Sequence, residues 1–134
     1  MRRLRVLTWH PHGSYLHYLT HAPHEFFVVS KPGRPPGYAG VTGHRPWGAN
    51  VHDLPASKIK AQQLDCILFQ DDAQYLADRY ELLSASQLGL PNIYLEHDPP
   101  RRSPTDERHP ADANDVLVVH VTRFNALMWR HVAA

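Results

Sequence analysis

The chain has 134 residues, of which 43% are hydrophobic and 20% charged, and its formal net charge is +1. This length suits one domain with its own core, and the composition excludes a disordered chain. The charges are interspersed without a dense basic patch, which argues against nucleic acid as the main partner. The single cysteine, Cys66, lies in an apolar run. An intrachain disulfide framework is therefore excluded, and a buried thiol is expected.

Targeting signals are weak. No apolar run approaches the length of a membrane span. The run after the basic residues Arg2 and Arg3 is too short for the core of a signal peptide. We therefore expect a cytoplasmic protein, although the basic N-terminus would also suit peripheral contact with the anionic inner face of a membrane.

Short apolar runs and helical patterns alternate along most of the chain. Strands are predicted over 4–9, 25–30, 50–54, 65–70, 92–98 and 115–121. Helices are predicted over 15–20, 55–63, 71–88 and 122–132. This alternation predicts an α/β fold: one Rossmann-like three-layer sandwich over residues 1–134, with a mostly parallel, six-stranded, doubly wound sheet. Two long loops, at about 31–50 and 99–114, interrupt it.

The helices should bury apolar stripes. Leu76, Tyr80 and Leu83 recur at helical spacing in the segment 71–88, which predicts a core-facing stripe. The last helix should begin at Thr122 as its cap. Its expected apolar face comprises Phe124, Leu127, Met128 and Val132.

The end of the fifth strand carries the best candidates for function. Glu96, His97 and Asp98 follow a buried apolar run, and two prolines then end regular pairing. In open α/β sheets, ligands bind at the carboxyl ends of the strands. Side chains alternate along a strand, so Glu96 should point away from His97. We therefore take His97 and Asp98 as the candidate catalytic residues.

Other polar residues should reach the same edge if the strands are parallel. They are His10, His12, Gly13 and Ser14 after the first strand, Gln70 after the fourth, and His120 and Thr122 after the sixth. These donors, acceptors and a helix N-terminus predict a site for a polyhydroxylated ligand. Thr122 also fits a helix cap, and His120 also fits a partly buried structural imidazole.

Two other classes of function remain open. One is a non-catalytic Rossmann-like module that binds a small anion or a protein partner. The other is a small zinc hydrolase using His10, His12, His97 and Asp98 as ligands. The zinc hypothesis is the weaker, because neither an HExxH motif nor paired CxxC motifs are present. Our leading prediction involves no metal and no cofactor.

Three segments together resemble a known family: residues 7–15, 93–99 and 116–125. The first is a strand entering a glycine-bearing loop and a helix, the second a strand ending in His-Asp-Pro, and the third an apolar strand before a hydroxyl-capped helix. In this order and spacing they resemble the N-terminal domain of GT-B glycosyltransferases with the family-four type of acceptor domain. The likeness covers nearly the whole chain.

The resemblance implies a nucleotide-sugar-dependent transferase. A sugar, lipid or protein acceptor would lie against this domain, and the donor would bind mainly to a second Rossmann-like domain. Gly13 and Ser14 would face the donor diphosphate. His97 would sit close to the transferred sugar, as a hydrogen-bond partner or a base, and no metal would be required.

The chain departs from the family in two respects. Its first loop has one glycine where such enzymes commonly carry two, and the donor-binding glutamates have no counterpart. We therefore expect a truncated form or a split subunit that is inactive alone. Such a half-enzyme should expose an apolar patch on the cleft side or self-associate through that face.

Overall fold

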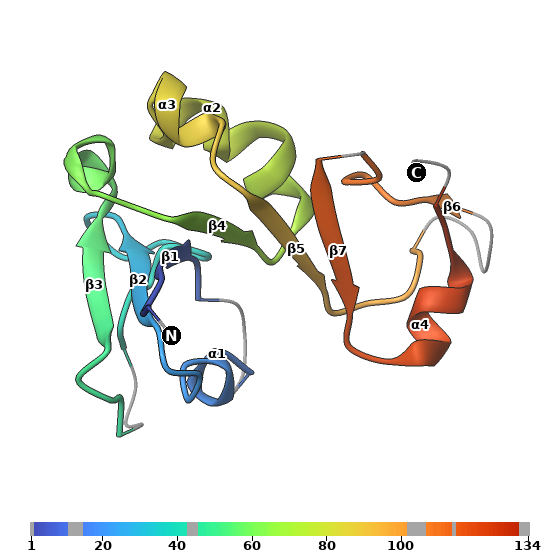
Figure 1. Ribbon diagram of the computed structural model, residues 1–134, viewed down its shortest axis with the longest axis horizontal. Helices are drawn as coiled ribbons and strands as arrows, with labels where there is room; N and C mark the ends of the chain where they lie inside the picture. Colours follow the sequence, from blue (N-terminus) through green and yellow to red (C-terminus); the bar gives the residue numbers. More distant parts are fainter. Residues whose placement is uncertain (1, 11–14, 43–45, 102–106, 114, 132–134) are drawn as a thin grey trace.

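The computed structural model describes residues 2–10, 15–42, 46–101, 107–113 and 115–131. Six strands form one sheet in the order β3-β2-β1-β4-β5-β7, and every neighbouring pair is parallel (Figure 1). These strands are β1 Arg5–Thr8, β2 Glu25–Ser30, β3 Val51–Pro55, β4 Cys66–Phe69, β5 Asn92–Glu96 and β7 Val116–His120. The predicted Rossmann-like α/β fold is confirmed. Adjacent β1 and β4 mark the topological switch point of a doubly wound sheet.

The central strands are continuous apolar runs because both of their faces are covered. All four residues of β4 are buried. Ile67 and Phe69 pack in the larger core cluster, whereas Cys66 and Leu68 pack in the smaller one on the other face. The thiol of Cys66 is buried and free, as predicted.

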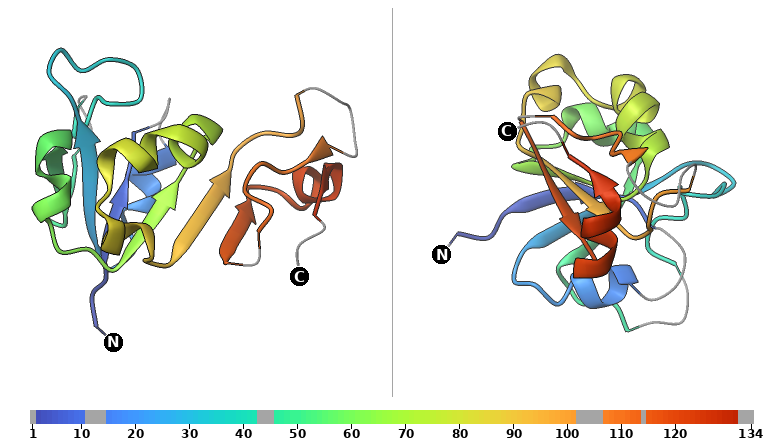
Figure 2. Two further views of the ribbon diagram at one scale, coloured as in Figure 1. Left: turned by 90° about the horizontal axis from the view of Figure 1, so that it is seen from above. Right: turned by 90° about the vertical axis from the view of Figure 1, so that its right-hand side faces the viewer.

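Helices flank the sheet on both sides. The α1 helix, Tyr15–Leu19, lies on one face, and α2 (Arg79–Leu82) and α3 (Ala85–Leu88) lie on the other (Figures 1 and 2). The short helix expected near residue 60 is a 3-10 helix, η1, over Ala56–Ala61.

The single long helix predicted over 71–88 is wrong in two places. A π-helical turn, η2, occupies Gln74–Asp78 before α2. The chain then becomes extended at Leu83, with φ −96° and ψ 146°. Ser84 starts a new helix through a capping box with Gln87, because both side chains satisfy backbone N–H groups at the helix start.

The predicted core stripe of this segment is wrong for Leu76 and Tyr80 and right for Leu83. Leu76 and Tyr80 are 54% and 60% exposed, whereas Tyr75, Leu82 and Leu83 are buried. A π-turn adds a residue to the helical repeat, so the buried face shifts relative to a regular α-helix. Leu76 is thereby freed from the core and lines a cavity instead.

The C-terminal helix is shorter and more exposed than predicted. The α4 helix spans Arg123–Met128 and is followed by a two-residue strand, β8 Trp129–Arg130, which pairs with β6 Glu107–Arg108. Phe124 and Leu127, expected in the core, are 68% and 80% exposed. The periodicity is present, but no described element covers that face. Val132 lies outside the described residues.

The two long loops differ in their packing. The loop between β2 and β3 forms an antiparallel bridge, Ser30 to Ala39. The segment between β5 and β7 is not the polar loop that was expected, because it contains β6 and because His109 and Ala111 are 2% and 0% exposed. Among the described residues, no helix is long and apolar enough to cross a membrane.

Candidate functional site

Gln70 connects the three strands at the switch point. It directly follows β4 and is 4% exposed. Its side-chain Nε2 donates to Thr8 Oγ1 at 2.8 Å and to the carbonyl oxygen of Trp9 at 2.7 Å. Its Oε1 lies 3.0 Å from His97 Nε2, beyond the end of β5. One buried amide therefore ties together the carboxyl ends of β1, β4 and β5.

These contacts determine that Nε2 of His97 carries a proton. The carbonyl of Trp9 can only accept a hydrogen bond, so the Gln70 atom facing it must be the amide nitrogen. The Gln70 oxygen then faces His97 and can only accept, so His97 Nε2 carries a proton. In the neutral imidazole, Nδ1 holds the free lone pair.

The surroundings favour the neutral form of His97. Burial lowers the pKa of His97, and the nearby carboxylates of Asp98 and Glu96 only partly oppose this shift. The Tyr15 ring packs edge-on against the imidazole, with centroids 4.7 Å apart. Among the described residues, Nδ1 has no hydrogen-bond partner, so it is available to accept a proton from a ligand.

A cavity of about 560 Å³ opens beside His97, and we call it the His97 cavity. Its polar and charged lining comprises His10, Gln70, Asp71, Asp72, Gln74, His97, Asp98 and Arg101. The cavity lies at the carboxyl ends of β1, β4 and β5, where doubly wound folds bind ligands.

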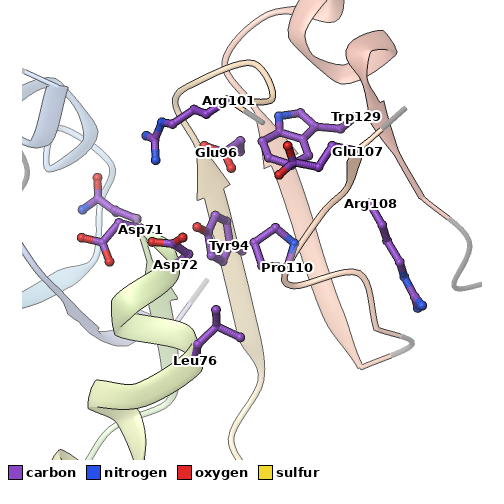
Figure 3. A pocket seen from close by; sticks show the side chains of 11 residues that line it. Asp71, Asp72, Leu76, Tyr94, Glu96, Arg101, Glu107, Arg108, Pro110 and Trp129 are labelled. Atoms are coloured by element: carbon purple, nitrogen blue, oxygen red, sulfur yellow. The ribbon is translucent and has the colours of Figure 1, made fainter. Parts of the chain in front are cut away.

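A second cavity of about 430 Å³ adjoins the first, and we call it the Trp129 cavity (Figure 3). The two share Gln70, Asp71, Asp72 and Arg101 in their linings. Leu76, Tyr94, Pro110 and Trp129 give the second cavity an apolar and aromatic surface, and Glu96 and Glu107 add carboxylates. The two cavities together could hold a ligand longer than one sugar ring.

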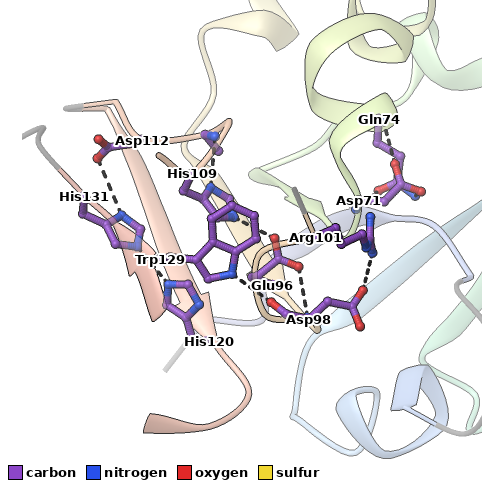
Figure 4. Close-up of polar contacts among 11 residues, drawn as sticks. Asp71, Gln74, Glu96, Asp98, Arg101, His109, Asp112, His120, Trp129 and His131 are labelled. Atoms are coloured by element: carbon purple, nitrogen blue, oxygen red, sulfur yellow. Dashed lines mark hydrogen bonds and ion pairs between the residues drawn. The ribbon is translucent and has the colours of Figure 1, made fainter. Parts of the chain in front are cut away.

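Asp98 lines the His97 cavity and is held by two contacts, one to its carboxylate and one to its backbone oxygen. Its carboxylate pairs with the guanidinium of Arg101, which raises the pKa of Arg101 (Figure 4). Its backbone oxygen accepts a 2.8 Å hydrogen bond from Trp129 Nε1. This second bond docks β8 onto the end of β5.

Glu96 has a structural role. The backbone N–H of Ala111 donates to His109 Nδ1, so His109 Nε2 must carry the proton that it shares with Glu96 Oε1 at 2.9 Å. The backbone N–H of Asp98 donates to Glu96 Oε2 at 3.1 Å (Figure 4). Both carboxylate oxygens are thus satisfied, and the pair fixes the buried His109 against β5.

The other site residues predicted from the sequence do not all lie at the two cavities. His10 lines the His97 cavity, and its Nδ1 lies 3.1 Å from the carbonyl of Gly40. Thr122 caps α4, with Oγ1 accepting from Asn125 N at 3.0 Å. His120 Nε2 lies 3.0 Å from His131 Nε2. The described linings of the two cavities include neither Thr122 nor His120. His12, Gly13 and Ser14 lie outside the described residues.

Sequence reasoning missed the residues that complete the second cavity. Tyr94 is a strand residue with the pattern of a core position, and Trp129 lies in a segment predicted as helix. Tyr94 stands two residues before Glu96 on β5, so its place near the motif follows from the sequence, whereas Trp129 is distant in the chain and only tertiary packing brings it there. Within the described part of the chain, no group of three or more His, Cys, Asp or Glu side chains could hold a metal ion.

Comparison with known proteins does not add a relative: no family model, no curated protein and no solved structure matches the chain.

Proposed function

We propose that this chain forms the acceptor side of a glycosyl-transfer site that a second, donor-binding domain completes. The observation that supports this most directly is the relay from the Trp9 carbonyl through Gln70 to His97. It leaves a neutral imidazole with an unoccupied Nδ1 beside a polar cavity at the switch point. A base with this character suits proton removal from an acceptor hydroxyl.

The proposed step moves one proton and exchanges one bond. The acceptor oxygen bonds to the anomeric carbon of the donor sugar as the bond from that carbon to the nucleoside diphosphate breaks. The proton of the acceptor hydroxyl passes to His97 Nδ1. Gln70 acts as a positioning residue, because it keeps the Nε2 proton of His97 directed away from the acceptor.

The lining of the His97 cavity favours a hydroxylated ligand over an anion. Three carboxylates line it, those of Asp71, Asp72 and Asp98, and the guanidinium of Arg101 is already paired with Asp98. Carboxylate and amide oxygens accept hydrogen bonds from sugar hydroxyls, whereas they repel a phosphate group.

Sugar binding can be tested on the protein alone by following its imidazole ¹⁵N resonances during titration. We expect neutral mono- and disaccharides to shift the His97 Nδ1 signal, and inorganic phosphate to leave it unchanged. His97→Gln identifies which signal belongs to His97, and the imidazole signals of His21 should not shift, because His21 is exposed and outside the described linings of both cavities. A response to phosphate but to no sugar would instead support the anion-binding module.

A transfer assay tests the half-site. We expect the chain alone, given a panel of nucleotide sugars and saccharide acceptors, to release nucleotide no faster than the His97→Gln variant does. The reason is that one domain cannot enclose both substrates and exclude water. Efficient turnover by the chain alone would contradict the half-site proposal.

A further inference from the structure

The Trp129 cavity has the features of a binding site in its own right. Its inner wall is Tyr94, which is only 1% exposed and whose ring packs edge-on against Tyr75 and His109. On the outer side, Trp129 is held by its indole N–H bond to the carbonyl of Asp98. The two aromatic side chains are therefore fixed in place before any ligand arrives, which reduces the entropic cost of binding.

The hydroxyl of Tyr94 is an unused donor in this wall. Among the described residues it has no hydrogen-bond partner, although the side chain is almost completely buried. In Figure 3 the ring directs its oxygen into the cavity on the side of Asp72. Burial raises the pKa of Tyr94, so the group stays protonated and able to donate at neutral pH. The oxygen faces the cavity, so an oxygen atom of a ligand that enters there can accept its hydrogen bond.

The charges of the cavity are unbalanced. Arg101 is held by Asp98, and Arg108 is held by Asp112 at 3.0 Å and extends away from the cavity centre in Figure 3. Within the described part of the chain, neither Asp71 nor Asp72 has an ion-pair partner. Partial burial raises the pKa of Asp71, and the neighbouring charges of Asp72 and Asp78 add to this rise. A cation placed between Asp71 and Asp72 would relieve this repulsion.

We propose that the Trp129 cavity binds a hydroxylated amine of the amino-sugar class. The ammonium group lies against Asp71 and Asp72, a ring oxygen or hydroxyl accepts from the Tyr94 hydroxyl, and the apolar side of the sugar ring packs on Trp129. The inference rests on the proposed function in one respect: it takes this amine to be the part of the acceptor that lies away from His97. The binding itself does not depend on transfer.

The test uses the indole N–H resonances of the protein, whose three tryptophans give separate probes. Glucosamine, N-acetylglucosamine, glucose and putrescine are titrated in parallel. We expect glucosamine to shift the Trp129 signal with an affinity at least tenfold higher than that of glucose or N-acetylglucosamine, which lack the positive charge. Equal shifts by glucosamine and glucose would overturn the proposal.

Two matched variants show whether glucosamine binding depends on the carboxylate in the cavity or on a general effect of the substitution on the fold. Asp72→Asn should weaken glucosamine binding about tenfold or more, which corresponds to about 1.4 kcal/mol. Asp115→Asn removes the same charge at an exposed position outside the described linings and should have no effect. If the two variants bind glucosamine equally, the ammonium site is wrong.

A third variant tests the proposed hydrogen bond between the Tyr94 hydroxyl and the sugar. Tyr94→Phe keeps the buried ring and removes only the hydroxyl, so it should weaken glucosamine several-fold and leave putrescine unchanged. Putrescine binding as tightly as glucosamine to the wild-type chain would overturn the amino-sugar assignment. Glucosamine binding without any response of His97 to neutral sugars would sink the transfer proposal and leave this one standing.

Discussion

The centre of the sheet and its β7 edge contain similar residues but have different surroundings. In β4, Ile67 and Phe69 are both 0% exposed because helices and neighbouring strands cover them. In β7, Leu117 and Val119 are 62% and 40% exposed, although these two side chains are as apolar as those of β4. Covering layers, and not strand composition, therefore decide how much each residue stabilises the fold. The candidate site lies where the two regions meet, with Gln70 on the well-covered side and Trp129 on the other.

The largest effect expected comes from emptying the well-covered core. Phe69→Ala should reduce the free energy of unfolding by about 3–5 kcal/mol, because it leaves a cavity beside Trp9 and Tyr75. Urea denaturation with matched m-values measures it. Phe124→Ala is the same substitution at a 68% exposed position and should cost no more than about 0.5 kcal/mol. Similar losses for both variants would contradict the asymmetry described above.

A smaller effect is expected at the boundary of the two regions. Gln70→Ala leaves the carbonyl of Trp9 and the Nε2 proton of His97 without their partner, which should cost about 1–3 kcal/mol of unfolding free energy. The exposed Gln63 provides the control, since its side chain makes no hydrogen bond to any residue that the structure describes. The variant should also lose the His97 Nδ1 response to sugars, because the imidazole can then change its tautomer.

On the less covered side, Trp129→Phe should have a local effect. It removes the indole donor to the Asp98 carbonyl and keeps the aromatic ring, so we expect a loss of about 0.5–1.5 kcal/mol. Hydrogen exchange should become faster in α4 and β8 while the amides of β4 stay protected. A uniform increase of exchange over the whole sheet would show that the two regions unfold together.

The smallest effect expected is a pH dependence spread across both regions. Burial lowers the pKa of His97, and burial together with His131 and His109 lowers that of His120. The folded state then binds fewer protons than the unfolded state, so stability increases with pH through this window. The contribution of these two histidines to stability is present above about pH 6.5, the ordinary pKa of histidine, and is lost as the pH falls below it. Unfolding measured from pH 8 to 5 should therefore show a smaller slope in the His97→Gln, His120→Gln double variant than in His21→Gln.

The strands could be predicted from the sequence because burial on both faces leaves a continuous apolar run, as in β2 and β4. Parallel pairing then indicated that Gln70, His97 and Asp98 share one edge. The helical faces could not be predicted in the same way. A π-turn moved Leu76 and Tyr80 out of the core, and no element in the described part of the chain covers Phe124 and Leu127, so periodicity alone gave the wrong burial.

The second cavity was beyond prediction for another reason. Tyr94, Pro110 and Trp129 meet only because β8 pairs with β6 and docks on Asp98. Pairs of two-residue strands carry almost no signal in a sequence, and the segment after Thr122 has the pattern of a longer helix.

The hydrogen bond from Trp129 to Asp98 holds the C-terminal segment beside the Trp129 cavity, so a ligand bound as proposed would also strengthen the docking of this segment. If such a ligand binds only the docked arrangement, linkage stabilises docking by about 2.7 kcal/mol at a hundred times its dissociation constant. Arg123 and Arg130, both exposed, place tryptic cleavage sites within this segment. The rate at which trypsin trims the segment should therefore fall as the cavity fills, which would make protease resistance a simple screen for ligands.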